Sequence, residues 1–380
     1  MKILLVGNYL PDRQESMQRF AKMLQVGLVE LGHEVRLIQP EPFFGKIKRS
    51  ASGLGKWLGY IDKFVIFPRQ LRSWADWADV VHICDHSNAV YTKYLNVPHV
   101  VTCHDLLAIC SALGEIEENP TKWTGRQLQR MILAGLERSH RIACVSEKTK
   151  TDLLRLAKVD TSTVSVIYNG LNYPYSQMET AESRKRLNSL GIASNSRFIF
   201  HVGGNDWYKN RLGVLTIFNY LRQEPDLSDL HLVMLGKPFT HQMQKFIQYN
   251  NLEMQVKELV ALENEDLRAL YSSATALIFP SLQEGFGWPI LEAQACGCPV
   301  FTSNRSPMTE VGGDAAIYIE PNSPKEAAQK IAYNLPFTEK LKQAGLKNAQ
   351  NFSTSKMIDE YIEIYNSLLN KKTLKQFKKI

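Results

Sequence analysis

The chain has 380 residues, 44% of them hydrophobic and 22% charged, and this ordinary globular composition excludes a fibre or an extensively disordered chain. One hydrophobic core seldom supports so long a chain, so two domains are expected. The formal net charge of +7 suits an acidic partner, whether nucleotide, anionic lipid or nucleic acid, and does not choose among them.

The N-terminal residues and the cysteines predict a cytoplasmic protein. The chain turns polar too soon for a signal peptide and begins as a strand would. No uncharged apolar run approaches the ~20 residues of a membrane span, so any membrane contact is expected to be peripheral, on the inner face. The cysteines lack the spacing of a zinc site and the density of a disulfide scaffold, which predicts reduced thiols. They are Cys84, Cys103, Cys110, Cys144, Cys296 and Cys298.

Short apolar strands alternate with amphipathic stretches, such as residues 17–31, through the first half of the chain. This alternation predicts an α/β fold with a mostly parallel sheet. A polar stretch over residues 172–197 interrupts the pattern and predicts the hinge between two domains. The strands predicted before it are residues 3–6, 35–38, 80–83, 97–103, 142–145 and 164–167.

The strand pattern restarts after the polar stretch, so two Rossmann-like halves are expected, each binding ligands at the carboxyl ends of its strands. No G-x-G-x-x-G fingerprint follows the first strand, which argues against a dehydrogenase. The apolar spacing from residue 354 onward predicts a long amphipathic helix. The strands predicted in the second half are residues 198–202, 231–235, 275–279, 299–302 and 316–319.

Residues 43–73 carry seven lysines and arginines against a single acid, Asp62, interleaved with aromatic and aliphatic side chains. This profile is typical of a helix or loop that lies on anionic lipid. The alternative is the basic flank of an ordinary packed helix, and both interpretations remain open.

Two segments with histidines follow strands of the first half. Residues 82–86, His-Ile-Cys-Asp-His, superficially suggest a metal site, yet His82 lies within the strand and His86 beyond it. No metal is therefore predicted, and the lining of an acceptor site or simple packing fits better. His104 follows the strand 97–103, at the end where this fold places ligand contacts. It either donates a hydrogen bond to a donor sugar, positions an acceptor hydroxyl, or is a loop histidine capped by Asp105.

Residues 203–211, Gly-Gly-Asn-Asp-Trp-Tyr-Lys-Asn-Arg, combine a glycine pair with positive charge. The glycines let the backbone pass close to a ligand. Lys209 and Arg211 lie near the start of a predicted helix, where fixed cations would stabilise the charge on a leaving diphosphate. The alternative is a pair of solvated cations at a helix start.

Residues 279–299 predict a strand, a glycine loop and a helix in succession. Gly285 and Gly287 permit positive φ, and Pro289 suits the first helical turn, so the helix N-terminus would favour a phosphate. Glu284 on the loop and Glu292 about one turn into the helix cannot share a helical face. Both suit hydrogen bonds from sugar hydroxyls.

Residues 284–293 read E-G-F-G-x-P-x-L-E-A and resemble the donor-binding signature of the retaining glycosyltransferases of family 4. The resemblance continues through residues 260–271, 297–300 and 310–316 and covers nearly the whole chain. It implies a GT-B fold, in which two Rossmann-like domains face each other across a cleft and a C-terminal helix returns to the N-terminal domain. The implied parts are residues 1–175, 176–355 and 356–380.

The resemblance also implies roles for individual residues, without a metal or a cofactor. The implied catalytic residues are His104, Lys209 and Glu284. The implied contacts are Leu262 to the base, Glu292 to the ribose, and Lys209 with the loop backbone to the diphosphate. The implied donor-binding residues are Gly7, Gly204, Asn205, Lys209, Arg211, Leu262, Glu284, Gly285, Phe286, Gly287 and Glu292.

The chain departs from the family pattern at two places. Residues 12–14 are Asp-Arg-Gln where many relatives have a glycine pair, so of the first loop only Gly7, with Arg13 as a further candidate, carries over. Asn205 stands where many relatives have an arginine. Either Arg211 supplies the second cation, or Asn205 binds by hydrogen bonds alone.

The expected function is transfer of a hexose, mannosyl or glucosyl, from a nucleotide sugar such as GDP-mannose or a UDP-hexose, with retention at the anomeric carbon. The acceptor would be a hydroxyl of a glycan, a lipid or a small molecule. The alternative is a catalytically silent subunit that binds nucleotide sugar. Nucleic acid is not an expected partner, because the basic residues are not clustered with aromatic ones on strands.

Overall fold

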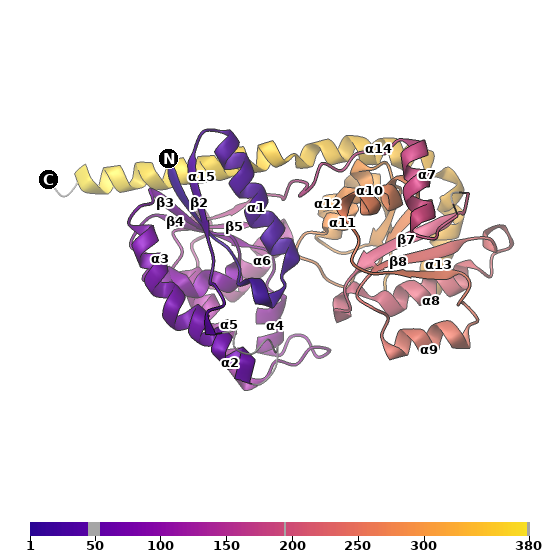
Figure 1. Cartoon of the computed structure of the whole chain (residues 1–380), viewed down its shortest axis with the longest axis horizontal. Coiled ribbons are helices and arrows are strands. Elements are labelled where there is room, and N and C mark those ends of the chain that lie inside the picture. The colour runs from indigo at the N-terminus through magenta and orange to yellow at the C-terminus, as the bar shows by residue number, and fades with distance from the viewer. Residues whose placement is uncertain (45–53, 194, 378–380) are drawn as a thin grey trace. The chain divides into compact units, whose positions relative to one another are not determined.

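The computed structural model describes residues 1–44, 54–193 and 195–377, and the chain divides into two compact units. Unit 1 comprises Met1–Asn172 and Thr354–Ile380, and unit 2 comprises Tyr173–Ser353 (Figure 1). Each unit contains one six-stranded sheet whose strands all run parallel. The expected α/β fold with two Rossmann-like halves is therefore confirmed.

The sheet of unit 1 has the strand order β2-β1-β3-β4-β5-β6, and every predicted strand is present within a few residues. The central strands are buried along their whole length, because helices cover both faces of a parallel sheet. The strands are β1 (Lys2–Val6), β2 (Glu34–Ile38), β3 (Val80–Ile83), β4 (His99–Cys103), β5 (Arg141–Cys144) and β6 (Val164–Val166). The helices are α1 (Glu15–Glu30), α2 (Leu54–Ile61), a π-helix (Asp62–Ile66), α3 (Phe67–Ala75), a 3-10 helix (His86–Tyr94), α4 (Leu107–Leu113), α5 (Trp123–Glu137) and α6 (Glu147–Leu156).

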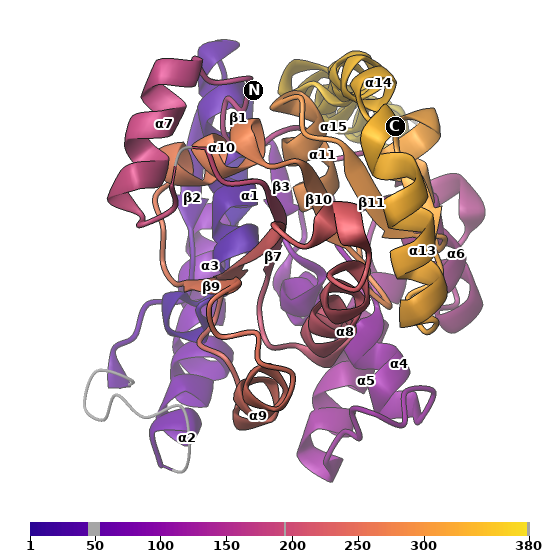
Figure 2. The same ribbon diagram turned by 90° about the vertical axis from the view of Figure 1, so that its right-hand side faces the viewer.

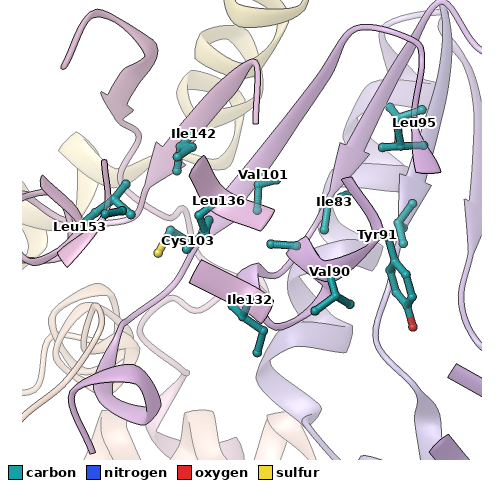
Figure 3. Close-up of a cluster of buried hydrophobic side chains, with 14 of the residues drawn as sticks. Ile83, Val90, Tyr91, Leu95, Val101, Cys103, Ile132, Leu136, Ile142 and Leu153 are labelled. Carbon is teal, nitrogen blue, oxygen red and sulfur yellow. The ribbon is translucent and has the colours of Figure 1, made fainter. Parts of the chain in front are cut away.

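The core of unit 1 joins the sheet to the helices beside it (Figure 3). Ile83, Val101 and Ile142 come from three adjacent strands, and Ile132 and Leu136 of α5 pack in the same cluster. Each such side chain contributes roughly 1.5–3 kcal/mol when fully buried. This packing fixes the strand ends, and therefore the loops that follow them.

The long helix α15 (Thr354–Phe377) returns to unit 1, as expected for the C-terminal helix. It is bound there through a buried chain of hydrogen bonds. The Nδ1 of His82 lies 2.6 Å from the hydroxyl of Tyr365, and its Nε2 lies 2.7 Å from Oγ1 of Thr102. That Oγ1 lies 2.8 Å from the hydroxyl of Tyr361. Both nitrogens of His82 are thus occupied in the interior.

The sheet of unit 2 has the strand order β12-β11-β10-β7-β8-β9. Helices α8 and α13 lie side by side against it (Figures 1 and 2). The strands are β7 (Phe198–Gly203), β8 (His231–Gly236), β9 (Val256–Leu259), β10 (Ala276–Phe279), β11 (Val300–Ser303) and β12 (Ile317–Ile319). The helices are α7 (Thr180–Ser189), α8 (Arg211–Leu221), α9 (His241–Tyr249), α10 (Asn264–Ser273), α11 (Trp288–Ala295), α12 (Met308–Gly312), α13 (Pro324–Asn334) and α14 (Glu339–Ala349).

Two features of unit 2 were not predicted from the sequence. Strand β9 lies at the edge of the sheet, where Lys257 is partly exposed and Glu258 is exposed. Because of these two charged residues, its sequence lacks the apolar pattern of a buried strand. The polar stretch read as a hinge contains α7, whose Arg186 lies 3.0 Å from Asp266 of α10. That stretch therefore belongs largely to unit 2, and the division between the units falls between Asn172 and Tyr173.

Among the helices of the described ranges, none has the length and apolar character that crossing a membrane requires.

Candidate functional site

The glycine loop of unit 2 connects β10 to α11, as the sequence predicted. Gly287 adopts φ of 104° directly before the helix, and Pro289 follows in the first turn. Phe286 is buried, with its ring centroid 6.1 Å from that of Trp288 and 6.0 Å from that of Phe352. The buried ring of Phe286 therefore anchors the loop to the core of the unit. Gly287 adopts a backbone conformation that other residues seldom adopt.

Lys209 and Glu284 come together in this unit. The Nζ of Lys209 lies 2.7 Å from Oε1 of Glu284, and their side chains are 17% and 9% exposed. Lys209 follows β7 and Glu284 follows β10, and these two strands are neighbours in the sheet. Because the carboxyl ends of adjacent parallel strands meet at one edge, the fold brings together two residues that are distant in sequence.

Arg211 lies buried at the same edge, with a relative exposure of 4%. Its Nη1 donates to the carbonyl of Lys237 over 2.7 Å and to the side-chain oxygen of Asn205. Its Nε and Nη2 are enclosed and have no hydrogen-bond partner among the described residues. Burial lowers the pKa of this guanidinium. A buried cation with unsatisfied N–H donors destabilises the fold unless an anion or a water molecule accepts hydrogen bonds from them.

The side chain of Asn205 is occupied within the protein. Its amide nitrogen donates to the carbonyl of Pro238 over 2.8 Å, while its oxygen accepts from Arg211. Of the two alternatives that the sequence left open, this geometry favours Arg211 as the second cation. Asn205 holds it in place.

His201, on β7, was not predicted as a site residue. Its Nδ1 lies 2.9 Å from the carbonyl of Ile278, and since a carbonyl only accepts, Nδ1 carries the proton. Nε2 is enclosed without a partner among the described residues, and burial lowers the pKa of His201 to about 3. A Cβ on Gly203 would lie 3.3 Å from this Nε2 and 3.4 Å from the Lys209 chain. The only sign of His201 as a site residue in the sequence was the presence of a histidine within an otherwise apolar strand.

Glu292 of α11 is 5% exposed, and Tyr271 of α10 donates its hydroxyl to Oε2 over 2.8 Å. Tyr271 is fully buried against Phe200, with ring centroids 5.2 Å apart. In the sequence Tyr271 occupies an apolar position of a helical pattern, which does not indicate its hydrogen bond to Glu292. Leu262 lies partly exposed in the segment after β9.

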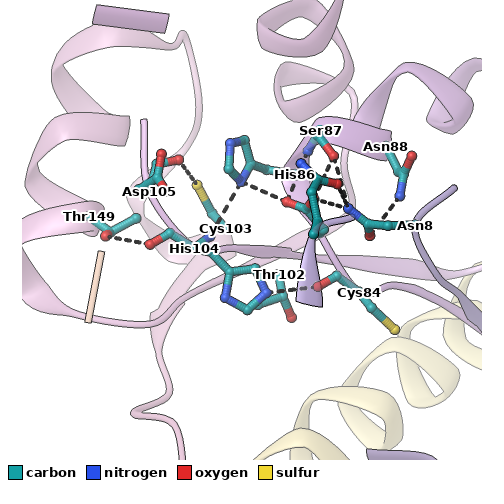
Figure 4. Close-up of polar contacts among 12 residues, drawn as sticks. Asn8, Cys84, His86, Ser87, Asn88, Thr102, Cys103, His104, Asp105 and Thr149 are labelled. Atoms are coloured by element: carbon teal, nitrogen blue, oxygen red, sulfur yellow. Dashed lines mark hydrogen bonds and ion pairs between the residues drawn. The ribbon is translucent and has the colours of Figure 1, made fainter. Parts of the chain in front are cut away.

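In unit 1, Gly7 and the first loop lie at the carboxyl end of β1. The N–H of Gly7 donates to Ile38 over 2.8 Å, and a Cβ there would lie 3.3 Å from side-chain atoms of Leu37 and Gln39. The glycine therefore permits close packing against the β2 end. Asn8, which follows, donates to Asp85 over 2.5 Å (Figure 4).

His104 lies at the carboxyl end of β4, as predicted, and is 5% exposed. Its Nε2 lies 2.9 Å from the carbonyl of Cys84, so Nε2 carries the proton (Figure 4). Burial lowers the pKa of His104. The neutral ring then offers Nδ1 as an acceptor, so a ligand at this nitrogen would donate to His104 rather than accept from it. The carboxylate of Asp105 accepts from the N–H of Leu107 at 3.0 Å, and among the described residues no hydrogen bond joins it to the His104 ring.

Both ring nitrogens of His82 are engaged inside unit 1, by Tyr365 and Thr102, so His82 does not converge with His86. Within the described parts of the chain, no group of three His, Cys, Asp or Glu side chains is placed to hold a metal ion.

Part of the basic segment 43–73 lies outside the described residues, including Lys46, Lys48 and Arg49. In the described part, Phe43 and Val65 are 70% and 49% exposed. Asp62 is instead buried, where it accepts from the Tyr9 hydroxyl at 3.0 Å. The single acid of the segment is therefore structural.

A family model described as Glycosyl transferases group 1 matches residues 182–352, and one described as Glycosyltransferase Family 4 matches residues 17–173. The chain belongs to glycosyltransferase family 4. The resemblance found in the signature of residues 284–293 is thereby confirmed, and the chain is a glycosyltransferase.

This family 4 chain is 24% identical over 369 residues to the O-antigen chain mannosyltransferase B of Escherichia coli, with 93% of this chain and 94% of that protein covered. A solved glycosyltransferase from Rickettsia africae ESF-5 aligns with a TM-score of 0.71 at 20% identity, covering 97% of this chain and 98% of that one. Anabaena Alr3699/HepE in complex with UDP and glucose aligns with a TM-score of 0.71 at 18% identity, covering 97% and 100%. The two structures support the fold.

Proposed function

We propose that this glycosyltransferase transfers a hexosyl group, mannosyl or glucosyl, from a nucleotide sugar to an acceptor hydroxyl with retention of anomeric configuration. The observation that carries the proposal is the gathering of Lys209, Arg211 and Glu284 at the carboxyl edge of the unit 2 sheet. Two cations there suit a diphosphate, and a carboxylate beside them suits the hydroxyls of the attached sugar.

The chemistry asks for positive charge where the leaving diphosphate develops negative charge. Arg211 retains two donor atoms, Nε and Nη2, without partners among the described residues, and both are enclosed in this structure. A shift of the side chains around them on binding would let an anion satisfy a buried group that is otherwise costly. Lys209 has three N–H donors and uses one on Glu284, which leaves it able to bridge the carboxylate and a phosphate oxygen. The backbone from Gly285 to Gly287 would complete the phosphate contacts.

The remaining donor contacts follow the family pattern. Glu292 would accept from the ribose and Leu262 would face the base, with Gly7 and Gly204 allowing close backbone approach. His104 would accept a hydrogen bond at Nδ1 from a sugar hydroxyl. The leaving diphosphate itself would take the acceptor proton on the same face of the sugar, so no covalent nucleophile, metal or cofactor is assigned.

The donor and acceptor are proposed by class. The Escherichia coli relative is named a mannosyltransferase of the O-antigen chain, and the Anabaena structure holds UDP and glucose. GDP-mannose and UDP-hexoses are accordingly the donors to test, with a glycan, lipid or small-molecule hydroxyl as acceptor. We place the protein in the cytoplasm, with peripheral contact to anionic lipid through residues 43–73, whose described apolar side chains include the exposed Phe43 and Val65.

A thermal-shift screen of GDP, UDP and their hexose derivatives tests the proposal first, because a ligand that binds only the folded state raises the unfolding temperature. The stabilising donor is then assayed for transfer, and the anomeric configuration of the product is read by NMR. Lys209→Ala is expected to abolish both the shift and the transfer. Lys325→Ala, an exposed lysine on α13, is the matched control and should change neither.

Three results would count against the proposal. Absence of any shift with nucleoside diphosphates would remove the donor site, and transfer retained by Lys209→Ala would remove its central cation. Binding without turnover, under every donor and acceptor tried, would instead favour the silent nucleotide-sugar-binding subunit.

A further inference from the structure

The carboxylate of Asp85 is the centre of a buried polar cluster in unit 1, at the carboxyl ends of β1, β3 and β4. Figure 4 labels its partners Asn8, His86 and Ser87. Asp85 is 2% exposed, and both of its oxygens are occupied. Oδ1 accepts from the N–H of Ser87 at 3.2 Å and lies 3.1 Å from Nδ1 of His86. Oδ2 accepts from Asn8 and from the Ser87 hydroxyl, each at 2.5 Å. Asp85 therefore has no capacity left for a ligand.

The ring of His86 is oriented by this carboxylate. The N–H of His104 also lies 3.4 Å from the same Nδ1, but a ring nitrogen cannot donate and accept at once. A bare Nδ1 would set its lone pair against a carboxylate 3.1 Å away, so Nδ1 carries a proton and donates to Asp85. Burial opposes charge on His86, yet Asp85 and, more weakly, Asp105 outweigh it and raise the pKa of His86.

The second nitrogen of His86 faces away from the cluster. The side chain is 10% exposed, and Nε2 has no hydrogen bond to any described residue and is not among the enclosed atoms. The titratable groups near the ring are Asp85, the half-buried Asp105 and His104, whose ring is neutral. In its protonated form this ring, which a buried carboxylate holds in one orientation, presents a single N–H at the ligand-binding edge of the sheet.

We propose that Asp85 and His86 form an acceptor-binding element, in which Nε2–H of His86 donates a hydrogen bond to an oxygen of the acceptor sugar. Asp85 is a positioning residue and does not touch the ligand. In its protonated form His86 acts as a donor and not as a base, because both ring nitrogens then carry protons. The inference rests on the proposed glycosyl transfer and names the side chain that orients its acceptor.

The competing explanation is that His86 only packs and pairs with Asp85, and two substitutions separate these roles. In His86→Gln the amide nitrogen lies near the place of Nε2, so the outward donor is kept and the contact to Asp85 is lost. In His86→Asn the amide lies near the place of Nδ1, so the inward contact is kept and the outward donor is lost. If His86 binds the acceptor, His86→Asn should weaken binding more than His86→Gln. If His86 only packs and pairs with Asp85, His86→Gln should be the more damaging change.

The probe is methyl α-D-mannopyranoside, whose binding to the full chain is followed by ligand-observed NMR. We expect His86→Asn to weaken binding about tenfold, as for loss of one hydrogen bond to a charged group, and His86→Gln to stay within about threefold of wild type. Binding should also weaken as pH rises through the raised pKa of His86. Asp85→Asn should move that weakening to lower pH, which a packing role would not do.

Stabilisation by GDP or UDP is measured in parallel on the same variants. It should be unchanged in the His86 variants, since the proposed side-chain contacts to the nucleoside diphosphate, Lys209, Arg211 and Glu292, lie in unit 2. Its absence in wild type would count against the donor proposal alone. The inference is overturned if wild type does not bind the mannoside, if His86→Asn binds it as wild type does, or if His86→Gln is the more damaging change.

Discussion

Lys209 and Glu284, 75 residues apart in the chain, form an ion pair of 2.7 Å across the ends of two adjacent strands. Removing one partner would leave the other poorly solvated, with 17% and 9% of the side chains exposed. Lys209→Met and Glu284→Gln should each lower the free energy of unfolding by about 1–3 kcal/mol, and the double variant by less than their sum. Urea denaturation of the four proteins measures this coupling, and strict additivity would show that the pair carries no interaction energy.

Arg211→Met should separate stability from nucleotide binding. Replacing a buried, incompletely bonded guanidinium by an apolar chain of similar length is expected to leave stability unchanged or to raise it by up to about 2 kcal/mol. The same change should weaken binding of a nucleoside diphosphate roughly 10- to 100-fold, because charge-assisted hydrogen bonds are lost. Denaturant titration measures the free energy of unfolding, and titration calorimetry measures the affinity for the nucleoside diphosphate. Arg197→Met, which breaks an exposed ion pair with Asp229 and a hydrogen bond to the carbonyl of Asp226, is the control.

A large loss of stability in Arg211→Met with unchanged nucleotide affinity would show that this arginine is structural. The order of the two effects therefore decides between an anion site and a packing residue.

Tyr271→Phe should weaken recognition of the ribose through Glu292. The hydroxyl of Tyr271 holds Oε2 of Glu292, so its removal leaves the carboxylate less well oriented. We expect the preference for a ribonucleoside diphosphate over its 2′- or 3′-deoxy analogue to fall by about tenfold, with little change in affinity for the deoxy analogue. Tyr318→Phe, which loses the hydrogen bonds of its hydroxyl to the carbonyls of Gly313 and Thr309, should keep the preference of the wild type. An unchanged preference in Tyr271→Phe would place the ribose elsewhere.

The fold was largely predictable because parallel strands covered on both faces are short, uncharged and apolar. Strands such as β3 and β10 were predicted within one residue of their bounds for this reason. Strand β9 failed the same test, since an edge strand with Lys257 and Glu258 need not be apolar. Helix α7 failed because its polar face outweighs the few buried side chains that anchor it.

The candidate site was predictable only where residue types stand in a recognisable local pattern. Lys209 and Glu284 lie in such patterns, although their direct contact joins two distant segments. Tyr271 and His201 look like core residues in the sequence, and their roles emerge from partners far along the chain. The orientation of His86 likewise depends on a bond network that spacing alone does not reveal.

Attachment of α15 to unit 1 should depend on pH through His82. Burial lowers the pKa of His82 from 6.5 to about 3, so the folded protein keeps this ring neutral while the unfolded chain takes up a proton. The contribution of neutral His82 to the free energy of unfolding is therefore fully present above pH 6.5. As pH drops from 6.5 toward 3, this contribution falls by about 1.4 kcal/mol per pH unit. His82→Gln should remove that part of the slope when unfolding free energy is measured from pH 7 to pH 4. Tyr365→Phe removes only one hydrogen bond and should lower stability by about 1 kcal/mol at every pH with the slope retained, whereas an unaltered slope in His82→Gln would assign the acid sensitivity to other buried groups.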